Sequence, residues 1–247
     1  MPWRETRSPY RILVSEFMLQ QTGIGRVANM YGPFLRHFPS FAALARASVA
    51  EVVAAWKGLG YNRRALALRQ TAALVVERHH GRLPKSLEEL RALPGIGPAT
   101  AGALLAYCFD IPVPFIETNI RRSFIHFFFR GELNIPDARL LPLVVEALDR
   151  ENPREWYYAL MDYGTMLARK GENPNRRSSA YKRQAAFEGS MRQLRGRILE
   201  IMLELRCATA AQIAAAVGRE EPRLSEALGK LAAEGFLERK GGRFYFR

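Results

Sequence analysis

The clearest chemistry in the chain belongs to a short glycine-containing turn. Residues 93–97 read Leu-Pro-Gly-Ile-Gly, and a helical segment opens directly after them at Pro98. Gly95 and Gly97 allow a tight turn and a close approach of the backbone to a ligand. The start of the following helix offers unpaired N–H groups and a positive dipole end, which suit a phosphate. The pattern predicts a helix-hairpin-helix that grips a DNA backbone; a plain corner between two helices is the alternative.

A second chemical candidate is the carboxyl group of Glu16. It lies in a helical stretch that opens at Ser8-Pro9, a cap residue followed by proline at the first helical position. Ile12 precedes Glu16 by one turn, and Leu19 follows about one turn later. Apolar neighbours raise the pKa of a carboxyl group and keep it protonated near neutral pH. Glu16 is therefore a candidate proton donor, and an exposed helix glutamate is the alternative.

The composition limits the class of protein. The chain has 247 residues, 48% of them hydrophobic, and 37 basic residues against 24 acidic ones give a net charge of +13. Such a surplus favours nucleic acid or an anionic membrane as partner. No apolar run approaches the roughly 20 residues that span a bilayer, and the N-terminus lacks the apolar core of a signal peptide. Two cysteines exclude a disulfide-framed module. We expect a cytoplasmic, nucleoid-associated protein.

Apolar periodicity predicts an almost entirely helical chain. Glycines stand at the joints between the periodic segments, as helix ends often require, and strand-like alternation is scarce before residue 235. The aromatic run Phe127–Phe129 is assigned to the core, with a platform for base stacking as the alternative. The expected helices cover 9–20, 25–38, 40–47, 49–57, 63–79, 86–92, 98–107, 118–128, 137–151 and 153–167.

The chain changes character near Arg169. Nine basic residues face only two acidic ones between Arg169 and Arg197. This composition indicates a basic linker, or a solvated connector as the alternative. We therefore predict three parts: a helical domain over residues 1–168, a basic linker over 169–189 and a separate domain over 190–247.

The last part has the pattern of a winged helix-turn-helix. Three helices are expected at 191–205, 209–217 and 221–234, and a Gly241-Gly242 turn joins two strand-like runs at 236–240 and 243–246. Such a unit usually contacts DNA with its third helix. The third helix here carries Glu221, Glu226 and Glu234 besides its two basic residues, so an interaction or dimerisation role stays open.

Several segments together resemble the helix-hairpin-helix–GPD (HhH-GPD) superfamily of base-excision DNA glycosylases, and within it the adenine glycosylase (MutY) family. They occur in family order and with family spacing, and they cover roughly residues 2–168. The resemblance implies a mainly α, two-lobed helical fold with the winged helix appended at its C-terminus. The matching segments are Pro2-Trp3-Arg4, Ser15 to Thr22, Gly58-Leu59-Gly60-Tyr61, Leu93 to Gly97 with Thr100-Ala101-Gly102, Glu117-Thr118-Asn119 and Leu160 to Gly164.

The resemblance assigns the catalytic residues. It makes Glu16 the acid that protonates the departing base, and Glu117 the anion that stabilises the cationic sugar or positions a water. Most relatives carry Asp at the position of Glu117. A cap at the start of a helix is the structural alternative for Glu117. Asn119 orients the carboxylate or its water. Ala99 stands where bifunctional relatives carry a Schiff-base lysine, which implies hydrolysis without strand cleavage.

The resemblance also assigns the DNA contacts. A substrate base must leave the duplex before it can react. Gln20 and Gln21 fill the gap in the base stack or bond the exposed bases, and Tyr61 stacks on the other side, unless it is a core aromatic. Ordinary surface charge is the alternative for the arginines. The remaining expected DNA contacts are Gly95, Gly97, Thr100, Arg63, Arg64, Arg121, Arg122, Arg176 and Arg177.

The chain departs from the adenine glycosylase pattern. An iron–sulfur loop needs four cysteines, and the matching segment 169–177 has none, so we expect no cluster and a basic loop in its place. The four histidines share no metal-ligand spacing, so no metal site is expected, whereas a monovalent cation at the hairpin is. A winged helix replaces the domain that reads 8-oxoguanine, and Asn62 replaces a second aromatic. The family usually has about one further helix before Pro2-Trp3-Arg4, so we expect either a start upstream of this one or a reduced helical barrel.

Three functions follow in order of preference. The first is a monomeric, monofunctional glycosylase acting on double-stranded DNA with a lesion or mismatch; its base is adenine, with hypoxanthine or mispaired thymine as alternatives. The second is a non-catalytic protein that binds damaged DNA. The third is a winged-helix regulator with a ligand-sensing N-terminal domain.

Overall fold

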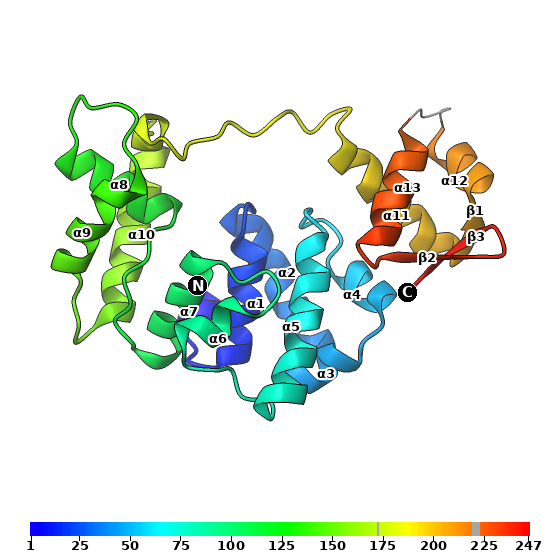
Figure 1. Ribbon diagram of the computed structural model, residues 1–247, viewed down its shortest axis with the longest axis horizontal. Helices are drawn as coiled ribbons and strands as arrows, with labels where there is room; N and C mark the ends of the chain where they lie inside the picture. The colour runs from blue at the N-terminus through cyan, green and yellow to red at the C-terminus, as the bar shows by residue number, and fades with distance from the viewer. Residues whose placement is uncertain (172, 219–222) are drawn as a thin grey trace. The chain divides into compact units, whose positions relative to one another are not determined.

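The computed structural model describes residues 1–171, 173–218 and 223–247 (Figure 1). These residues are mainly helical, as the sequence predicts. No helix among them is long and apolar enough to cross a membrane. The helices are α1 Pro9–Leu19, α2 Ile24–His37, α3 Phe41–Arg46, α4 Val49–Ala55, α5 Arg63–His79, α6 Leu87–Arg91, α7 Pro98–Phe109, α8 Thr118–Phe128, α9 Asp137–Ala147, α10 Pro153–Arg169, α11 Met191–Leu205, α12 Ala210–Val217 and α13 Leu224–Ala233, with 3-10 turns η1 Pro2–Arg4 and η2 Pro174–Arg177 and strands β1 Cys207–Thr209, β2 Leu237–Lys240 and β3 Arg243–Phe246.

Local capping explains where several helices begin. The Ser48 side chain accepts from the Glu51 N–H, and the Glu51 carboxylate accepts from the Ser48 N–H at 2.7 Å, which closes a capping box on α4. Thr209 and Gln212 close a second box on α12. The periodic segments predicted at 63–79, 118–128 and 191–205 match α5, α8 and α11 at both ends.

The described chain divides into two compact units that are each discontinuous in sequence. One contains residues 1–2, 14–82 and 185–247, and the other contains residues 3–13 and 83–184. These limits differ from those of the predicted domains, because residues 185–247 belong to the same unit as α2 to α5. The division into 1–168, 169–189 and 190–247 therefore stays a prediction.

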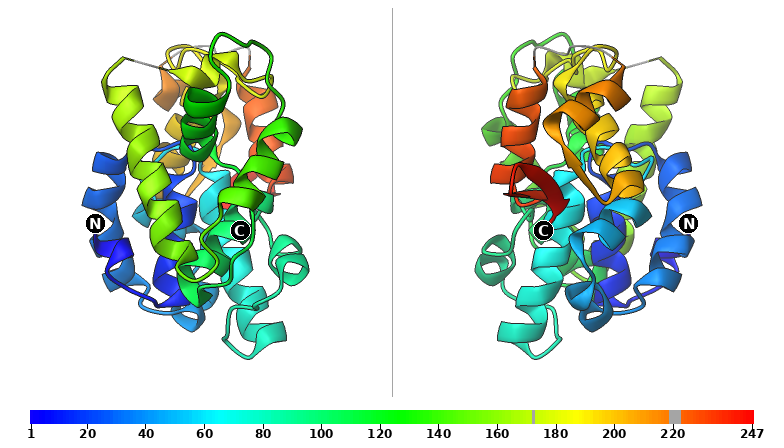
Figure 2. Two further views of the ribbon diagram at one scale, coloured as in Figure 1. Left: turned by 90° about the vertical axis from the view of Figure 1, so that its left-hand side faces the viewer. Right: turned by 90° about the vertical axis from the view of Figure 1, so that its right-hand side faces the viewer.

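In the unit formed by residues 3–13 and 83–184, α8 and α10 run side by side (Figure 2, left). Phe115 and Tyr157 stack with their ring centroids 4.0 Å apart in its core. The buried Arg154 guanidinium donates to the Tyr107 carbonyl at 2.9 Å and to the Thr6 carbonyl at 2.8 Å. Arg154 thereby attaches the N-terminal segment to α7 and α10.

In the other unit, one hydrophobic core joins α4 and α5 to the C-terminal elements. Val49 and Val53 of α4 pack in the same buried cluster as Ile198, Leu228 and Phe236. The predicted terminal hairpin is present, and its strand β2 packs against α13 (Figure 2, right). The order of three helices and a hairpin is the one expected of a winged helix-turn-helix.

One strand of this fold is absent from the prediction. Strand β1 was not predicted; it pairs antiparallel with β3, so the sheet order is β1-β3-β2. Three residues are too short to show an alternating pattern, so only the pairing partner defines this strand. Of the predicted third helix, 221–234, residues 221 and 222 lie outside the described residues.

Two further expectations, for the run Phe127–Phe129 and for the segment 169–189, are wrong. The run Phe127–Phe129 is not a core segment, since Phe127 and Phe128 are 55% and 54% exposed and only Phe129 is buried. The segment 169–189 is not a solvated linker throughout. Asn175 and Ser178 are buried, and residues 174–177 pack against α8.

Candidate active site and DNA-binding surface

The predicted hairpin is present between α6 and α7. Gly95 has a positive φ of 76°, which only glycine adopts without strain, and Gly97 precedes Pro98 in extended conformation. Both glycines are exposed, and the partly exposed Thr100 lies in the first turn of α7. The geometry has the tight turn and the open helix start that a phosphate contact needs. The binding of a DNA phosphate or a monovalent cation there stays a prediction.

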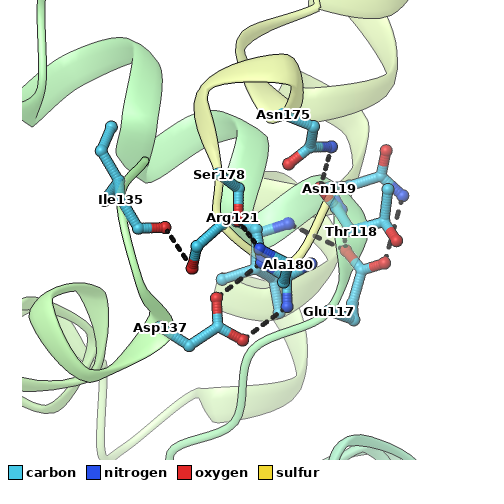
Figure 3. A network of polar contacts seen from close by, with 11 residues as sticks. Glu117, Thr118, Asn119, Arg121, Ile135, Asp137, Asn175, Ser178 and Ala180 are labelled. Atoms are coloured by element: carbon cyan, nitrogen blue, oxygen red, sulfur yellow. Dashed lines mark hydrogen bonds and ion pairs between the residues drawn. The ribbon is translucent and has the colours of Figure 1, made fainter. Parts of the chain in front are cut away.

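Glu117 occupies the cap position of α8. Its Oε1 atom accepts from the Asn119 N–H at 2.5 Å and from the Ile120 N–H at 2.8 Å (Figure 3). Glu117 therefore does cap α8, as the structural alternative predicts. The capping role is compatible with a chemical role, because the capping bonds fix the position of the carboxylate. They leave the Oε2 atom with only a longer contact of 3.4 Å to Asn119 Nδ2.

Burial raises the pKa of the Glu117 carboxyl group, against the hydrogen bonds from Ile120 and Asn119 and the charges of Arg121 and Arg122. The residue as a whole keeps some exposed surface. The Glu117 carboxyl group is thus in a poorly solvated position, with the cations Arg121 and Arg122 beside it. In its ionised form, such a group stabilises a positive charge that develops next to it.

Asn119 is held on both sides. Its Oδ1 accepts from Arg122 at 2.6 Å, and Arg122 also donates to the Gly164 carbonyl on α10 at 2.7 Å. Asn175 of η2 donates to the Thr118 carbonyl at 2.8 Å (Figure 3). The start of α8 is therefore fixed by α10 and by the segment after it, and the predicted pair Glu117 and Asn119 is brought together.

Gly164 is the contact through which α10 supports this site. A Cβ atom at Gly164 would lie 2.8 Å from the Cα of Asn119 and closer still to its carbonyl oxygen. We predict that Gly164→Ala displaces the start of α8, costs about 1–3 kcal/mol in the free energy of unfolding and slows base excision roughly tenfold or more. Gly196→Ala on α11 is the matched control, because a Cβ there meets nothing within 4 Å. Urea denaturation and single-turnover rates measure both; equal behaviour of the two variants would contradict the assignment.

Glu16 lies on the other compact unit, in the last turns of α1. It is partly exposed between the buried Ser15 and Phe17, and Ile12 one turn earlier is buried. Glu16 is therefore not a fully exposed helix glutamate. The role of Glu16 as the proton donor stays a prediction.

Arg64 corrects the sequence analysis. It was expected to contact phosphate, yet it is only 8% exposed and donates to protein oxygens. At the end of α1 it bonds the carbonyls of Phe17 at 2.8 Å, Met18 at 3.0 Å and Gln20. It also bonds the hydroxyl of Thr22 and the carbonyls of Leu59, Gly60 and Tyr61. One guanidinium thus joins the Gln20–Thr22 turn to the Gly58–Tyr61 turn, the two segments expected to enter the DNA stack.

Tyr61 has a neighbour that the sequence did not reveal. It is partly exposed with a positive φ of 47°, so the core interpretation is wrong. The Arg192 guanidinium lies 5.3 Å from its ring centroid and donates to its hydroxyl. Gln20 is partly exposed, and Gln21 is exposed with a φ of 55°. Arg192 stood out only as one member of the basic run, and nothing in the sequence paired it with Tyr61.

The other expected phosphate-binding arginines divide into two groups. Arg121 forms a two-point ion pair with Asp137 at 2.6 and 2.7 Å. Arg177 donates to the carbonyls of Phe129 and Ile125 at the end of α8. Arg177 and Arg122 therefore use their guanidinium groups for hydrogen bonds within the protein. Arg63 is exposed and pairs with Glu234. Arg176 is exposed and stays the best-placed predicted phosphate contact in this segment.

A largely apolar cavity of about 290 Å³ adjoins the hairpin, and its lining includes Ala99 of α7 and Ile116, which precedes Glu117. Ala99 brings no amine to this cavity. Among the described residues, no group of three or more His, Cys, Asp or Glu side chains could hold a metal ion. The absence of an iron–sulfur cluster remains a prediction from the cysteine count.

Comparison with known proteins identifies the family. The family model described as HhH-GPD superfamily base excision DNA repair protein matches residues 14–139. The adenine DNA glycosylase of Mycobacterium tuberculosis (strain ATCC 25618 / H37Rv) is 36% identical over 222 residues, which cover 82% of this chain and 73% of that protein. The adenine DNA glycosylase of Mycolicibacterium smegmatis is 31% identical over 264 residues, which cover 99% of this chain and 90% of that protein.

Solved structures agree in fold. A thermostable thymine-DNA glycosylase superposes with a TM-score of 0.60 at 25% identity, over 68% of this chain and 79% of that one. An endonuclease III bound non-covalently to DNA superposes with a TM-score of 0.55 at 16% identity, over 66% and 74% of the two chains, a likeness of fold alone. This chain therefore belongs to the HhH-GPD superfamily of base excision DNA repair proteins and is a DNA N-glycosylase.

Proposed function

We propose that this glycosylase excises adenine from mispairs in double-stranded DNA and leaves the strand itself uncut. The observation that carries the proposal is the enclosed Glu117 carboxylate, fixed by the first N–H groups of α8 and flanked by Asn119. The two mycobacterial relatives, at 36% and 31% identity, are named for adenine. That shared name supports the choice of base.

The proposed reaction divides between two carboxyl groups. Glu16 gives its proton to the departing base, which leaves with the electron pair of the N-glycosidic bond. Glu117 stabilises the positive charge that the sugar acquires, and a water molecule then adds to the sugar carbon and releases a proton. Asn119 and the α8 N–H groups hold Glu117 in place. Gln20, Gln21 and Tyr61 hold the opened duplex.

The enzyme is proposed to act as a monomer without an iron–sulfur cluster, in the cytoplasm at the nucleoid. Ala99 supports a purely hydrolytic reaction, because an alanine cannot form the Schiff base that strand cleavage requires. The exposed Gly95, Gly97 and Arg176 are the proposed phosphate contacts.

A lesion panel tests the proposal. Duplexes with A opposite 8-oxoguanine, A opposite G, hypoxanthine, or a G:T mismatch are incubated with the enzyme, and strand breaks are scored with and without alkali. We expect breaks on the adenine duplexes only after alkali. Glu16→Gln should slow excision by about 10²–10⁴-fold while binding to an abasic analogue persists. Unchanged turnover in Glu16→Gln, or tight binding without cleavage of any duplex, would favour a non-catalytic damage-binding protein.

A second candidate substrate is mispaired thymine. The thermostable thymine-DNA glycosylase has the same fold at 25% identity over 68% of this chain. Cleavage of the G:T duplex without cleavage of the adenine duplexes would select this candidate.

A further inference from the structure

The hairpin β2–β3 carries an arrangement of charge that protein contacts do not explain. Lys240 and Arg243 lie directly opposite each other in the strand register, on either side of the Gly241-Gly242 turn. Like charges opposite each other in a strand pair repel and destabilise the pair. Both side chains are exposed, and that of Lys240 is 71% exposed. A bound anion would remove this repulsion.

The residues around Lys240 and Arg243 do not neutralise the positive charge of this pair. Glu238 reaches Lys240 at 2.8 Å, and Arg243 touches the Cys207 sulfur at 3.9 Å. Arg239 is also exposed at the same tip, so three basic residues face one acidic residue over residues 237–246. Among the described residues, Arg239 and Arg243 form no ion pair with a carboxylate.

The turn itself is open to a bulky partner. Gly241 and Gly242 have φ values of 54° and 77°, the conformation of a two-residue hairpin turn that glycine favours. A Cβ atom at either position would meet nothing within 4 Å. A polymer backbone can therefore approach the peptide groups between the two cations without meeting side chains.

The third helix is a poorer DNA-binding surface than the hairpin. The described part of α13 with its flanking residues carries two basic residues, Arg223 and Lys230, and two acidic ones, Glu226 and Glu234. Lys230 pairs with Glu226 at 2.5 Å. Glu234 is bound by Arg63 of α5 and Arg195 of α11, which holds that end of the helix against its own unit.

We propose that the hairpin tip formed by Arg239, Lys240, Gly241, Gly242 and Arg243 binds the phosphodiester backbone of duplex DNA, and that α13 does not. The chain belongs to a DNA repair superfamily and has a net charge of +13, so duplex DNA is the polyanion it meets. The phosphates bridge Lys240 and Arg243 and offset their repulsion. The contact is independent of base sequence, because it uses charge and backbone only.

The test uses the full chain and an undamaged duplex, so it does not depend on which base the enzyme removes. The double variant Lys240→Ser/Arg243→Ser should bind roughly tenfold more weakly, and its slope of log K against log salt should fall by about 2. The control Arg78→Ser/Arg82→Ser removes the same charge from exposed positions of the same unit and should keep the wild-type slope. The double variant Ser225→Glu/Gly229→Glu places negative charge on exposed positions of α13 and should bind like wild type.

Three outcomes would overturn the proposal. Wild-type affinity and slope in the Lys240→Ser/Arg243→Ser variant would show that the tip does not meet DNA, and an equal loss in the Arg78→Ser/Arg82→Ser control would leave only a general effect of net charge. A loss confined to Ser225→Glu/Gly229→Glu would assign the contact to α13.

Light scattering on each variant checks whether the tip instead joins two copies of the chain. Excision at saturating enzyme on the adenine duplex should be unchanged in the tip variant, so failure of the proposed substrate and failure of the tip contact remain distinguishable.

Discussion

Glu117→Gln is expected to reduce the single-turnover rate of base excision by about 10²–10³-fold without lowering the stability of the protein. Glutamine keeps the length of the side chain and an oxygen for the Asn119 and Ile120 N–H groups, which are 2.5 and 2.8 Å from Oε1 in the wild type. It removes the negative charge that the proposed reaction needs beside the sugar. Quenched-flow or manual single-turnover assays on the adenine duplex measure the rate.

The raised pKa of Glu117 sets the sign of the stability change. Burial makes the folded state hold the Glu117 proton more tightly than the unfolded chain does. Between the unfolded and the folded pKa the native protein binds more protons, so its stability falls as pH rises through that window and stays lower above it. Glu117→Gln lacks this loss and should be as stable as the wild type, or more stable, at neutral pH. In the wild type, we expect the excision rate to fall as pH falls, because Glu117 becomes protonated. The excision rate of Glu117→Gln should not show this dependence on the protonation of residue 117.

Glu117→Asp is the informative companion variant. It restores the charge with a side chain one methylene shorter, the residue that the family resemblance implies at this position. Excision well above that of Glu117→Gln would show that charge matters at this position. A Glu117→Gln enzyme that excises at the wild-type rate but unfolds more easily would reduce Glu117 to a helix cap.

Arg64→Met is expected to cost about 3 kcal/mol or more in the free energy of unfolding, because several buried carbonyls lose a charged donor. Burial already lowers the pKa of Arg64 to about 10, so the guanidinium stays protonated at neutral pH. Its partners include the carbonyls of Phe17, Met18, Leu59 and Gly60. Methionine fills a similar volume and donates nothing to them.

Arg63→Met is the matched control for this variant. Arg63 is the preceding residue, its side chain is 69% exposed and it pairs with Glu234, so its loss should cost about 1 kcal/mol or less. Urea denaturation followed by circular dichroism compares the two variants. Arg64→Lys should lie between Arg64→Met and the wild type, since one ammonium cannot reach all the oxygens that the guanidinium reaches. Equal stability of Arg63→Met and Arg64→Met would contradict the role of Arg64 as the link between the two turns.

Local chemistry in the sequence determined the helices and the terminal hairpin. The apolar period and the cap residues placed α5, α8 and α11 at both ends, and Gly241-Gly242 placed the hairpin turn. The hairpin of Gly95 and Gly97 and the pair Glu117 and Asn119 also depend on contacts within a few residues. Short-range hydrogen bonds and backbone conformations of this kind are encoded where they act, so the sequence reveals them directly.

Only the tertiary structure decided what the basic residues do. The sequence marks Arg63, Arg64 and Arg121 alike as cations, yet Arg64 is buried among carbonyls, whereas Arg63 and Arg121 pair with Glu234 and Asp137. Arg192 donates to the hydroxyl of Tyr61, 131 residues away in the chain. A long basic side chain can reach water, a carboxylate, a carbonyl or an aromatic ring, and its choice depends on groups that are distant in sequence. Residue type and spacing contain no information about those groups, so the assignment requires the packed chain.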